Sequence, residues 1–250
     1  MAKMLKYSRI MSRKLGGFRI RTKIVKALII CLIAGSITFL WANRTYADWQ
    51  VGNYRDSTNG VTALIFTPGT RPFLIEAGSS GQANWVSTLV EDINGKDWLQ
   101  AGWRYYYWDA VPKHYYEYCI DCQIEGLGTY YIDDSFATQT WGTVVDYWII
   151  WDGNQRWCAY TASIQRECVD NLHTAPALVL GKSEVHNYLR NELDTTFDQV
   201  RYKDSANNWR LFDQSHFNTS GPYRVEIYSN YHYRTYRIST HEIYLPTISK

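Results

Sequence analysis

One short segment of the sequence gathers ionisable side chains on a single face of a strand. Alternate residues of a strand point to opposite faces, so residues 180–186 (LGKSEVH) direct Lys182, Glu184 and His186 to one side. Residues two apart on a strand are separated by about 6.5–7 Å, and a nearby cation favours the ionised form of a carboxylic acid. Glu184, flanked by Lys182 and by a protonated His186, therefore suits the role of a general base.

A second segment, 98–106 (WLQAGWRYY), has two contrasting faces. A glycine next to a polar residue on the same face leaves room for a ligand backbone to approach, and Gln100 has Gly102 as such a neighbour. A single Gln or Glu on a strand usually faces solvent, so neither segment identifies a site by itself. The alternation predicts a polar face with Gln100, Gly102, Arg104 and Tyr106, and a core face with Leu99, Ala101, Trp103 and Tyr105.

The familiar catalytic motifs do not occur in this sequence. It has no Gly-x-Ser-x-Gly elbow, no His-Glu-x-x-His helix and no phosphate-binding loop. The six histidines are scattered without metal-ligand spacing, so no metal site or cofactor is predicted. Four carboxylates remain without an assigned role: Asp109, Glu117, Asp133 and Asp134.

Short strands rich in β-branched and aromatic residues would have to position these side chains. Asn94-Gly95 and Asp152-Gly153-Asn154 are turn signals that predict two hairpins. A helix over 183–193 competes with the end of one strand, because its apolar residues have helical spacing. The expected strands cover 61–66, 84–93, 97–108, 128–132, 142–151, 155–160, 177–186, 199–202, 208–212 and 223–229.

Many short strands without an alternating βαβ pattern predict an all-β fold, an antiparallel sandwich or barrel. Residues 48–250 are expected to form one domain, since no long linker interrupts them. Within it, residues 48–82 are open to two interpretations, a propeptide or the first strands of the sandwich.

The order of two motifs resembles a known group of peptidases. Trp85-Val86 followed by Leu99-Gln100-Ala101-Gly102 is similar to the glutamic peptidases (eqolisins), in which a Trp-Val strand precedes a Leu-Gln-Thr-Gly segment. The longer stretch from Leu99 to Trp103, followed by aromatic residues and Cys119-x2-Cys122, also resembles the neprosin family. The closest counterpart of the neprosin Gly-Gly-Glu-Val segment is 181–185 (GKSEV). The resemblance covers roughly residues 84–230 and implies a concanavalin-like double β-sandwich, or jelly roll.

The resemblance implies that Gln100 and Glu184 are the catalytic pair of a peptidase acting on polypeptides. A carboxylate can take a proton from the attacking water and return it to the leaving amine. A side-chain amide can stabilise the developing oxyanion, an effect of about 10²–10³ in rate. This chemistry requires no metal, no cofactor and no covalent intermediate. Other residues expected to line the binding site are Trp85, Arg104, Tyr106, Lys182 and His186.

Three positions depart from the family patterns. Leu89 stands where eqolisins carry an Asp, and Lys182 replaces a glycine beside Glu184. Gln100 stands where neprosins carry Glu, so the pair is of the eqolisin type within neprosin-like surroundings. The family tends to act in acid, and the acidic composition of residues 48–250 is compatible with acid tolerance.

The charge of the chain is divided unevenly between a leader and a body. Residues 1–47 hold ten of the 26 Lys and Arg and none of the 24 Asp and Glu, so residues 48–250 carry 16 basic against 24 acidic side chains, a net charge of −8. A body of this sign argues against nucleic acid as a partner. The basic start, the apolar run 27–41 and Thr45-Tyr46-Ala47 predict an export signal peptide cleaved before Asp48. An uncleaved signal anchor, tethering the protein to a membrane, is the alternative. After cleavage we expect an extracellular protein without membrane contact.

Four cysteines remain in the exported part, and an even number there predicts disulfides. We expect the local pairs Cys119–Cys122 and Cys158–Cys168. A zinc site is the rival interpretation, because Cys119-x2-Cys122 also has ligand spacing.

Two other functions compete with the peptidase. A non-catalytic, lectin-like binding module is compatible with the same fold, and the aromatic run 103–118 could supply rings that stack on sugars. A glycoside hydrolase needs two facing carboxylates and ranks last, because the Glu-x-Asp-x-x-Glu strand motif is absent. The sequence does not indicate an oligomeric state.

Overall fold

The structure, a computed structural model, describes residues 49–238 except 79, 92–95, 123–128, 135–136, 187–189 and 215. The predicted signal peptide and the Asn94-Gly95 turn lie outside these residues. The described residues all belong to one compact unit, Ala47–Lys250. None of them forms a helix long and apolar enough to cross a membrane.

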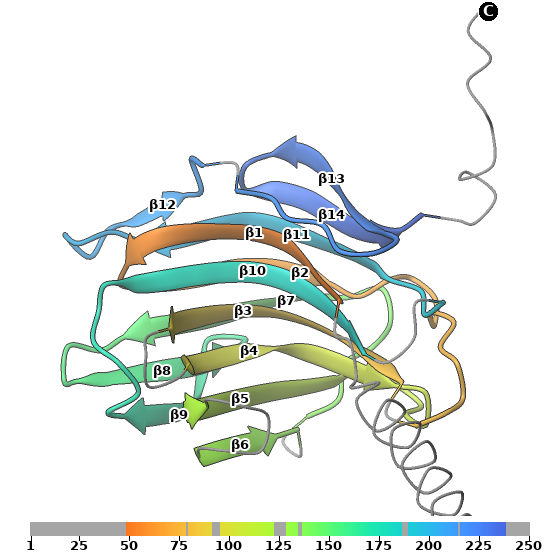
Figure 1. Cartoon of the computed structure of the whole chain (residues 1–250), viewed down its shortest axis with the longest axis horizontal. Helices are drawn as coiled ribbons and strands as arrows, with labels where there is room; N and C mark the ends of the chain where they lie inside the picture. Colours follow the sequence, from red (N-terminus) through yellow and green to blue (C-terminus); the bar gives the residue numbers. More distant parts are fainter. Residues whose placement is uncertain are drawn as a thin grey trace, which may run out of the picture. The chain divides into compact units, whose positions relative to one another are not determined.

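The described strands form two antiparallel sheets that stack as a sandwich, which confirms the predicted all-β fold class (Figure 1). The six-stranded sheet has the order β1 (Trp49–Thr58), β10 (Ala177–His186), β3 (Gly81–Glu91), β4 (Lys96–Tyr106), β5 (Lys113–Cys122) and β6 (Thr129–Asp133). The eight-stranded sheet has the order β13 (Tyr223–Ser229), β14 (His232–Arg237), β11 (Asp194–Lys203), β2 (Gly60–Phe66), β7 (Val144–Trp151), β8 (Arg156–Thr161) and β9 (Ile164–Asp170), with β12 (Trp209–Leu211) beside β11.

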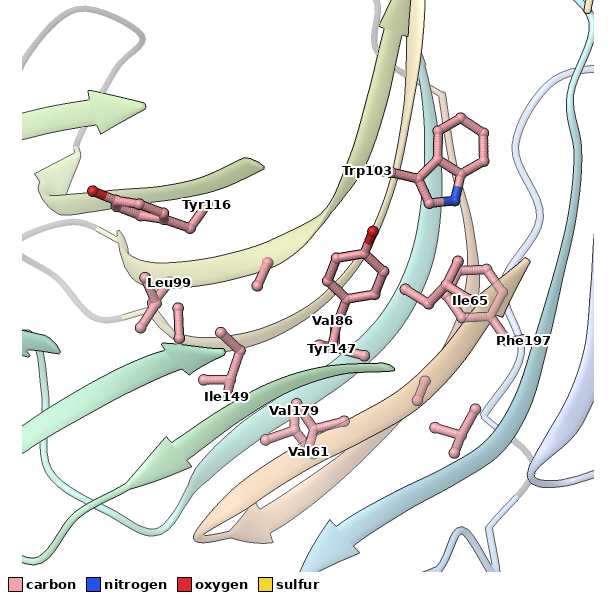
Figure 2. Packing of buried hydrophobic residues seen from close by; sticks show 14 of the residues in the cluster. Val61, Ile65, Val86, Leu99, Trp103, Tyr116, Tyr147, Ile149, Val179 and Phe197 are labelled. Atoms are coloured by element: carbon pink, nitrogen blue, oxygen red, sulfur yellow. The ribbon is translucent and has the colours of Figure 1, made fainter. Parts of the chain in front are cut away.

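The main hydrophobic core fills the space between the two sheets. Leu99 and Trp103 of β4 and Val179 of β10 are fully buried there, as the alternation of residues predicts. They meet fully buried side chains of the second sheet, including Ile149 and Phe197 (Figure 2). Because the core face of β4 is sealed in this way, its other face is turned away from the second sheet. We call that side of the six-stranded sheet the outer face.

Most of the expected strands are present, and two have the predicted bounds, β10 and β13. The hairpin of β7 and β8 around Asp152-Gly153-Asn154 is confirmed. The helix considered over 183–193 is wrong for the described residues of that range, because β10 continues to His186 and residues 190–193 are not helical. β10 lies between β1 and β3 and pairs with both, so two hydrogen-bonded ladders outweigh the helical spacing of its apolar residues.

Residues 49–66, at the start of the predicted body, belong to both sheets. β1 pairs with β10 at the edge of the first sheet, and β2 lies between β11 and β7 in the second. Four strands, β1, β5, β9 and β14, have no counterpart among the strand ranges expected from the sequence.

Both predicted cysteine pairings are confirmed. Cys158 and Cys168 lie directly opposite each other on β8 and β9, with Cα atoms 4.0 Å apart. Cys119 and Cys122 are joined within β5, with Cα atoms 6.0 Å apart. The zinc alternative for the Cys119-x2-Cys122 spacing is thereby replaced by a disulfide. Across the part of the chain that the structure describes, no group of three or more His, Cys, Asp and Glu is placed to hold a metal ion.

A buried histidine in the core makes folding sensitive to acid. His114 of β5 is 8% exposed, and its Nδ1 lies 2.6 Å from the Tyr147 hydroxyl, which donates to Gln139. Burial, and then the charge of Arg166, lower the pKa of His114 from 6.5 to about 4. The unfolded chain therefore binds a proton that the folded protein excludes between these two values.

We expect this histidine to reduce stability as pH falls from 6.5 toward 4. The full shift corresponds to about 3 kcal/mol of unfolding free energy. His114→Gln should lose less stability than the wild type between pH 7 and pH 4, as measured by urea unfolding at both values. Equal losses in the two proteins would contradict this assignment.

Candidate active site

A pocket of about 710 Å³ opens on the outer face of the six-stranded sheet. It brings together all seven residues that the sequence singled out as catalytic or binding, from three different strands. The six on β4 and β10 project from the face that strand alternation predicts. These residues are Trp85 of β3, Gln100, Arg104 and Tyr106 of β4, and Lys182, Glu184 and His186 of β10.

Strand register places Gln100 and Glu184 on opposite sides of the pocket floor. Gln100 pairs with Ser87 of β3, whereas Glu184 pairs with Ala83 on the other side of the same strand. The two positions are thus four residues apart along β3, about 13 Å at roughly 3.3 Å per residue. Trp85 occupies the position between them and is 3% exposed. Their side chains must therefore converge over Trp85 to act on one substrate.

Tyr115 of β5 marks the point of convergence. Trp85, Gly102 and Tyr115 form one row across the strands, because Gly102 of β4 pairs with Trp85 on one side and with Tyr115 on the other. Gln100 Nε2 donates to the Tyr115 hydroxyl at 3.2 Å, so the amide is directed toward this middle row. Burial raises the pKa of Tyr115, and the negative charges of Glu117 and Glu184 raise it further. Both carboxylates are therefore within electrostatic reach of the hydroxyl that Gln100 contacts.

Gly102 has a different role from the one that the sequence suggested. A Cβ atom at this position would lie 1.9 Å from the carbonyl oxygen of Asn84. The space beside Gln100 is thus occupied by the backbone of β3 and is not open to a ligand backbone. Gly102 is required for the close approach of β3 and β4.

Glu184 lies beside Lys182 and His186, as the alternation along β10 predicts. Its side chain is 12% exposed, and His186 Nδ1 lies 4.0 Å from its Oε1. Lys182, two residues earlier on β10, is 8% exposed. Burial lowers the pKa of Lys182, and the charge of Glu184 raises it in opposition. This attraction is mutual and favours a carboxylate over a carboxylic acid at Glu184.

Glu117 is a site residue that the sequence analysis left unassigned. It lies directly opposite Gln100 on β5 and lines the same pocket. Burial, followed by the charge of Glu184, raises its pKa from 4.5 to about 7, while a hydrogen bond with Tyr130 works in the opposite direction. Glu117 is therefore a neutral acid over most of the acidic range. Pro112 is the local signal that β5 is a separate strand from β4, and alternation along β5 then puts Tyr115, Glu117 and Cys119 on one face.

Arg104 and Tyr106 form one wall of the pocket. The Arg104 guanidinium makes an ion pair with Asp134 at 2.6 Å and lies 5.2 Å from the centre of the Tyr106 ring. The Tyr106 ring lies 6.1 Å from that of His186 across the pocket. Asp109 has a structural role, because it accepts a hydrogen bond from the Tyr106 backbone and pairs with Lys113. Leu89, which replaces the eqolisin Asp, also lines the pocket and makes that part apolar.

Comparison with known proteins supports the fold. No family model and no curated protein sequence matches the chain. A structure of scytalido-glutamic peptidase with a transition state analog inhibitor matches with a TM-score of 0.53 and 12% identity, covering 78% of this chain and all of that one. SCP-B, a member of the Eqolisin family in a complex with the tripeptide Ala-Ile-His, matches with a TM-score of 0.47 at the same identity and coverage.

A glycoside hydrolase family 16 endo-glucanase from Bacteroides ovatus has a TM-score of 0.33 and 10% identity, covering 55% of this chain and 66% of that one. The match to scytalido-glutamic peptidase with its transition state analog inhibitor shows that this chain shares the fold of a glutamic peptidase. The neprosin resemblance stays a prediction.

The raised pKa of Glu117 predicts a measurable effect on stability. The folded protein holds a proton on Glu117 that the unfolded chain has lost between pH 4.5 and 7, so this contribution is complete below pH 4.5 and is lost as pH rises through 7. Glu117→Gln should therefore be more stable than the wild type at pH 8 by about 3 kcal/mol, with no such gain at pH 4. Urea unfolding at both pH values measures the difference. A gain of equal size at both would show that Glu117 titrates normally.

Proposed function

We propose that this chain is a secreted peptidase that hydrolyses peptide bonds with a carboxylate–amide pair, Glu184 and Gln100. The observation that carries the proposal is their position in one pocket, where Gln100 donates a hydrogen bond to Tyr115 and Glu184 acts electrostatically on the same hydroxyl. The shared fold with a glutamic peptidase adds support. The two disulfides are compatible with an extracellular protein.

In the proposed reaction, Glu184 removes a proton from a water molecule as the water attacks the peptide carbonyl carbon. Gln100 Nε2, which donates to Tyr115 in the free protein, turns to the carbonyl oxygen and stabilises its developing negative charge. Glu184 then returns the proton to the leaving nitrogen. The water molecule, the carbonyl carbon and the carbonyl oxygen would lie between the Glu184 carboxylate and the Gln100 amide. The two side chains therefore act without contacting each other.

Glu117 completes the proposed mechanism through its neutral state. A carboxylate directly opposite Gln100 would repel an oxyanion bound to that amide. Because the pKa of Glu117 is about 7, this repulsion is absent in acid and appears as pH rises through neutrality. Activity should therefore decline above pH 7.

A carbohydrate ligand is the second candidate for this pocket. Tyr130 lines the pocket, is 55% exposed, and makes an edge contact with Trp98 at 6.1 Å, so aromatic rings are available for stacking on a sugar. Glu117 and Glu184 would provide a neutral acid and a carboxylate for glycoside hydrolysis. Without hydrolysis, the same rings would form a lectin-like site.

Proteolysis of a denatured protein substrate tests the first candidate. We expect cleavage between about pH 4 and 7, reduced about 10²–10⁴-fold by Glu184→Gln and about 10²–10³-fold by Gln100→Ala. Matched controls are Glu226→Gln on β13 and Gln165→Ala on β9, which make the same changes at exposed positions outside the pocket. Mass spectrometry of the products measures the rates.

Cleavage that survives both pocket substitutions would refute the catalytic pair. Binding or hydrolysis of an oligosaccharide, with no peptide hydrolysis by the wild type at any pH, would favour the second candidate.

A further inference from the structure

Lys182 is a buried cation that the proposed reaction does not use. It lies in the middle row of the outer face, between Gly52 of β1 and Trp85 of β3. A Cβ atom at Gly52 would lie 2.9 Å from Lys182 Cγ, so the missing side chain provides the space in which the lysine stem lies. The side chain is 8% exposed and lines the pocket.

The other strongly basic side chains of the pocket already have partners. Arg104 pairs with Asp134 at 2.6 Å, and Lys96 pairs with Glu91 at 3.2 Å. Lys182 has no carboxylate of the described residues within 4.0 Å, although Glu184 acts on it electrostatically from two residues away. A buried ammonium without a close counter-ion is costly. A ligand that carries a negative charge would reduce this cost.

We propose that Lys182 binds a carboxylate of the substrate, so that the pocket selects peptides with a negative charge next to the scissile bond. This inference rests on the proposed function. Lys182 lies one row from Gln100 and one row from Glu184, each about 6.6 Å along the strands. The carboxylate it holds therefore belongs to a residue that flanks the cleaved bond.

The charge balance favours a carboxylate over a phosphate. Lys182 provides one positive charge and has Glu184 as a neighbour, whereas a phosphate group carries about −1.5 to −2 at neutral pH. Two sources of the carboxylate remain possible in chemical terms, an Asp or Glu side chain and a free C-terminus. The first would give cleavage within a chain, and the second would give release of a terminal residue.

A set of octapeptides separates these sources. Every peptide is built on the same neutral sequence with one Phe-Ala bond. In the first group, one position at a time is replaced by Glu or by Gln, and the C-terminus is amidated. The second group has no acidic residue, and its C-terminus is either free or amidated. The variants are Lys182→Met, which keeps an apolar stem over Gly52, and Lys182→Arg, which keeps the charge. Lys96→Met is the matched control, because it removes a pocket cation that already has a partner.

For the wild type we expect kcat/KM to be at least about tenfold higher for the best carboxylate peptide than for its neutral counterpart. Lys182→Met should bring this ratio close to one, while Lys182→Arg and Lys96→Met should keep it. The position or terminus that gives the preference identifies the source of the carboxylate. A wild-type ratio near one, or an unchanged ratio in Lys182→Met, would overturn the proposal.

Calorimetric titration of the same peptides separates this inference from the proposed function. If the wild type cleaves peptides without a charge preference, the peptidase proposal stands and the role of Lys182 is refuted. If no peptide is cleaved, a carboxylate-dependent affinity that Lys182→Met abolishes would keep the anion site and refute the peptidase. The absence of both cleavage and carboxylate-dependent binding would refute the Lys182 site directly.

Discussion

The site depends on one constraint, the register of the ladder β10–β3–β4–β5. Side chains of these strands alternate between the inter-sheet core and the outer face, so a shift by one residue would exchange Leu99 for Gln100 in the core. The close approach of β3 and β4 at Gly102, which tolerates no Cβ, helps to fix this register. Core packing and site geometry are therefore two results of the same pairing.

Burial acts in opposite directions on the ionisable groups of this sheet. It raises the pKa of Glu117 and lowers the pKa of Lys182, so both are moved toward their neutral forms. On the core side, burial lowers the pKa of both His114 and His173 to about 4. The histidines oppose folding in acid, whereas Glu117 opposes it at alkaline pH. Acid tolerance is thus limited by the core, although the body of the protein carries excess acidic residues.

Much of the candidate site could be predicted because strand alternation is a local property. The faces of 98–106 and 180–186 follow from a period of two, and the structure keeps both. Glu117 was missed because its role depends on which strand lies beside Gln100, a long-range pairing that no local pattern contains. Gly102 was misread for the same reason, since the atom that excludes a side chain there belongs to β3. β5 was not expected as a strand of its own, because most of it lies in the aromatic run 103–118, which continues across Pro112.

The Cys158–Cys168 bridge makes the two borders of the eight-stranded sheet unequal. It pins the outermost strand β9 to β8, whereas β13, at the opposite border, carries exposed Ile227 and Tyr228 and is joined to β14 through ordinary ladder bonds. Thermal fraying should accordingly begin at β13, whose amide protons would exchange with solvent deuterium before those of β9. A second chain that added a strand at this border during self-association would cover the exposed apolar side chains of β13.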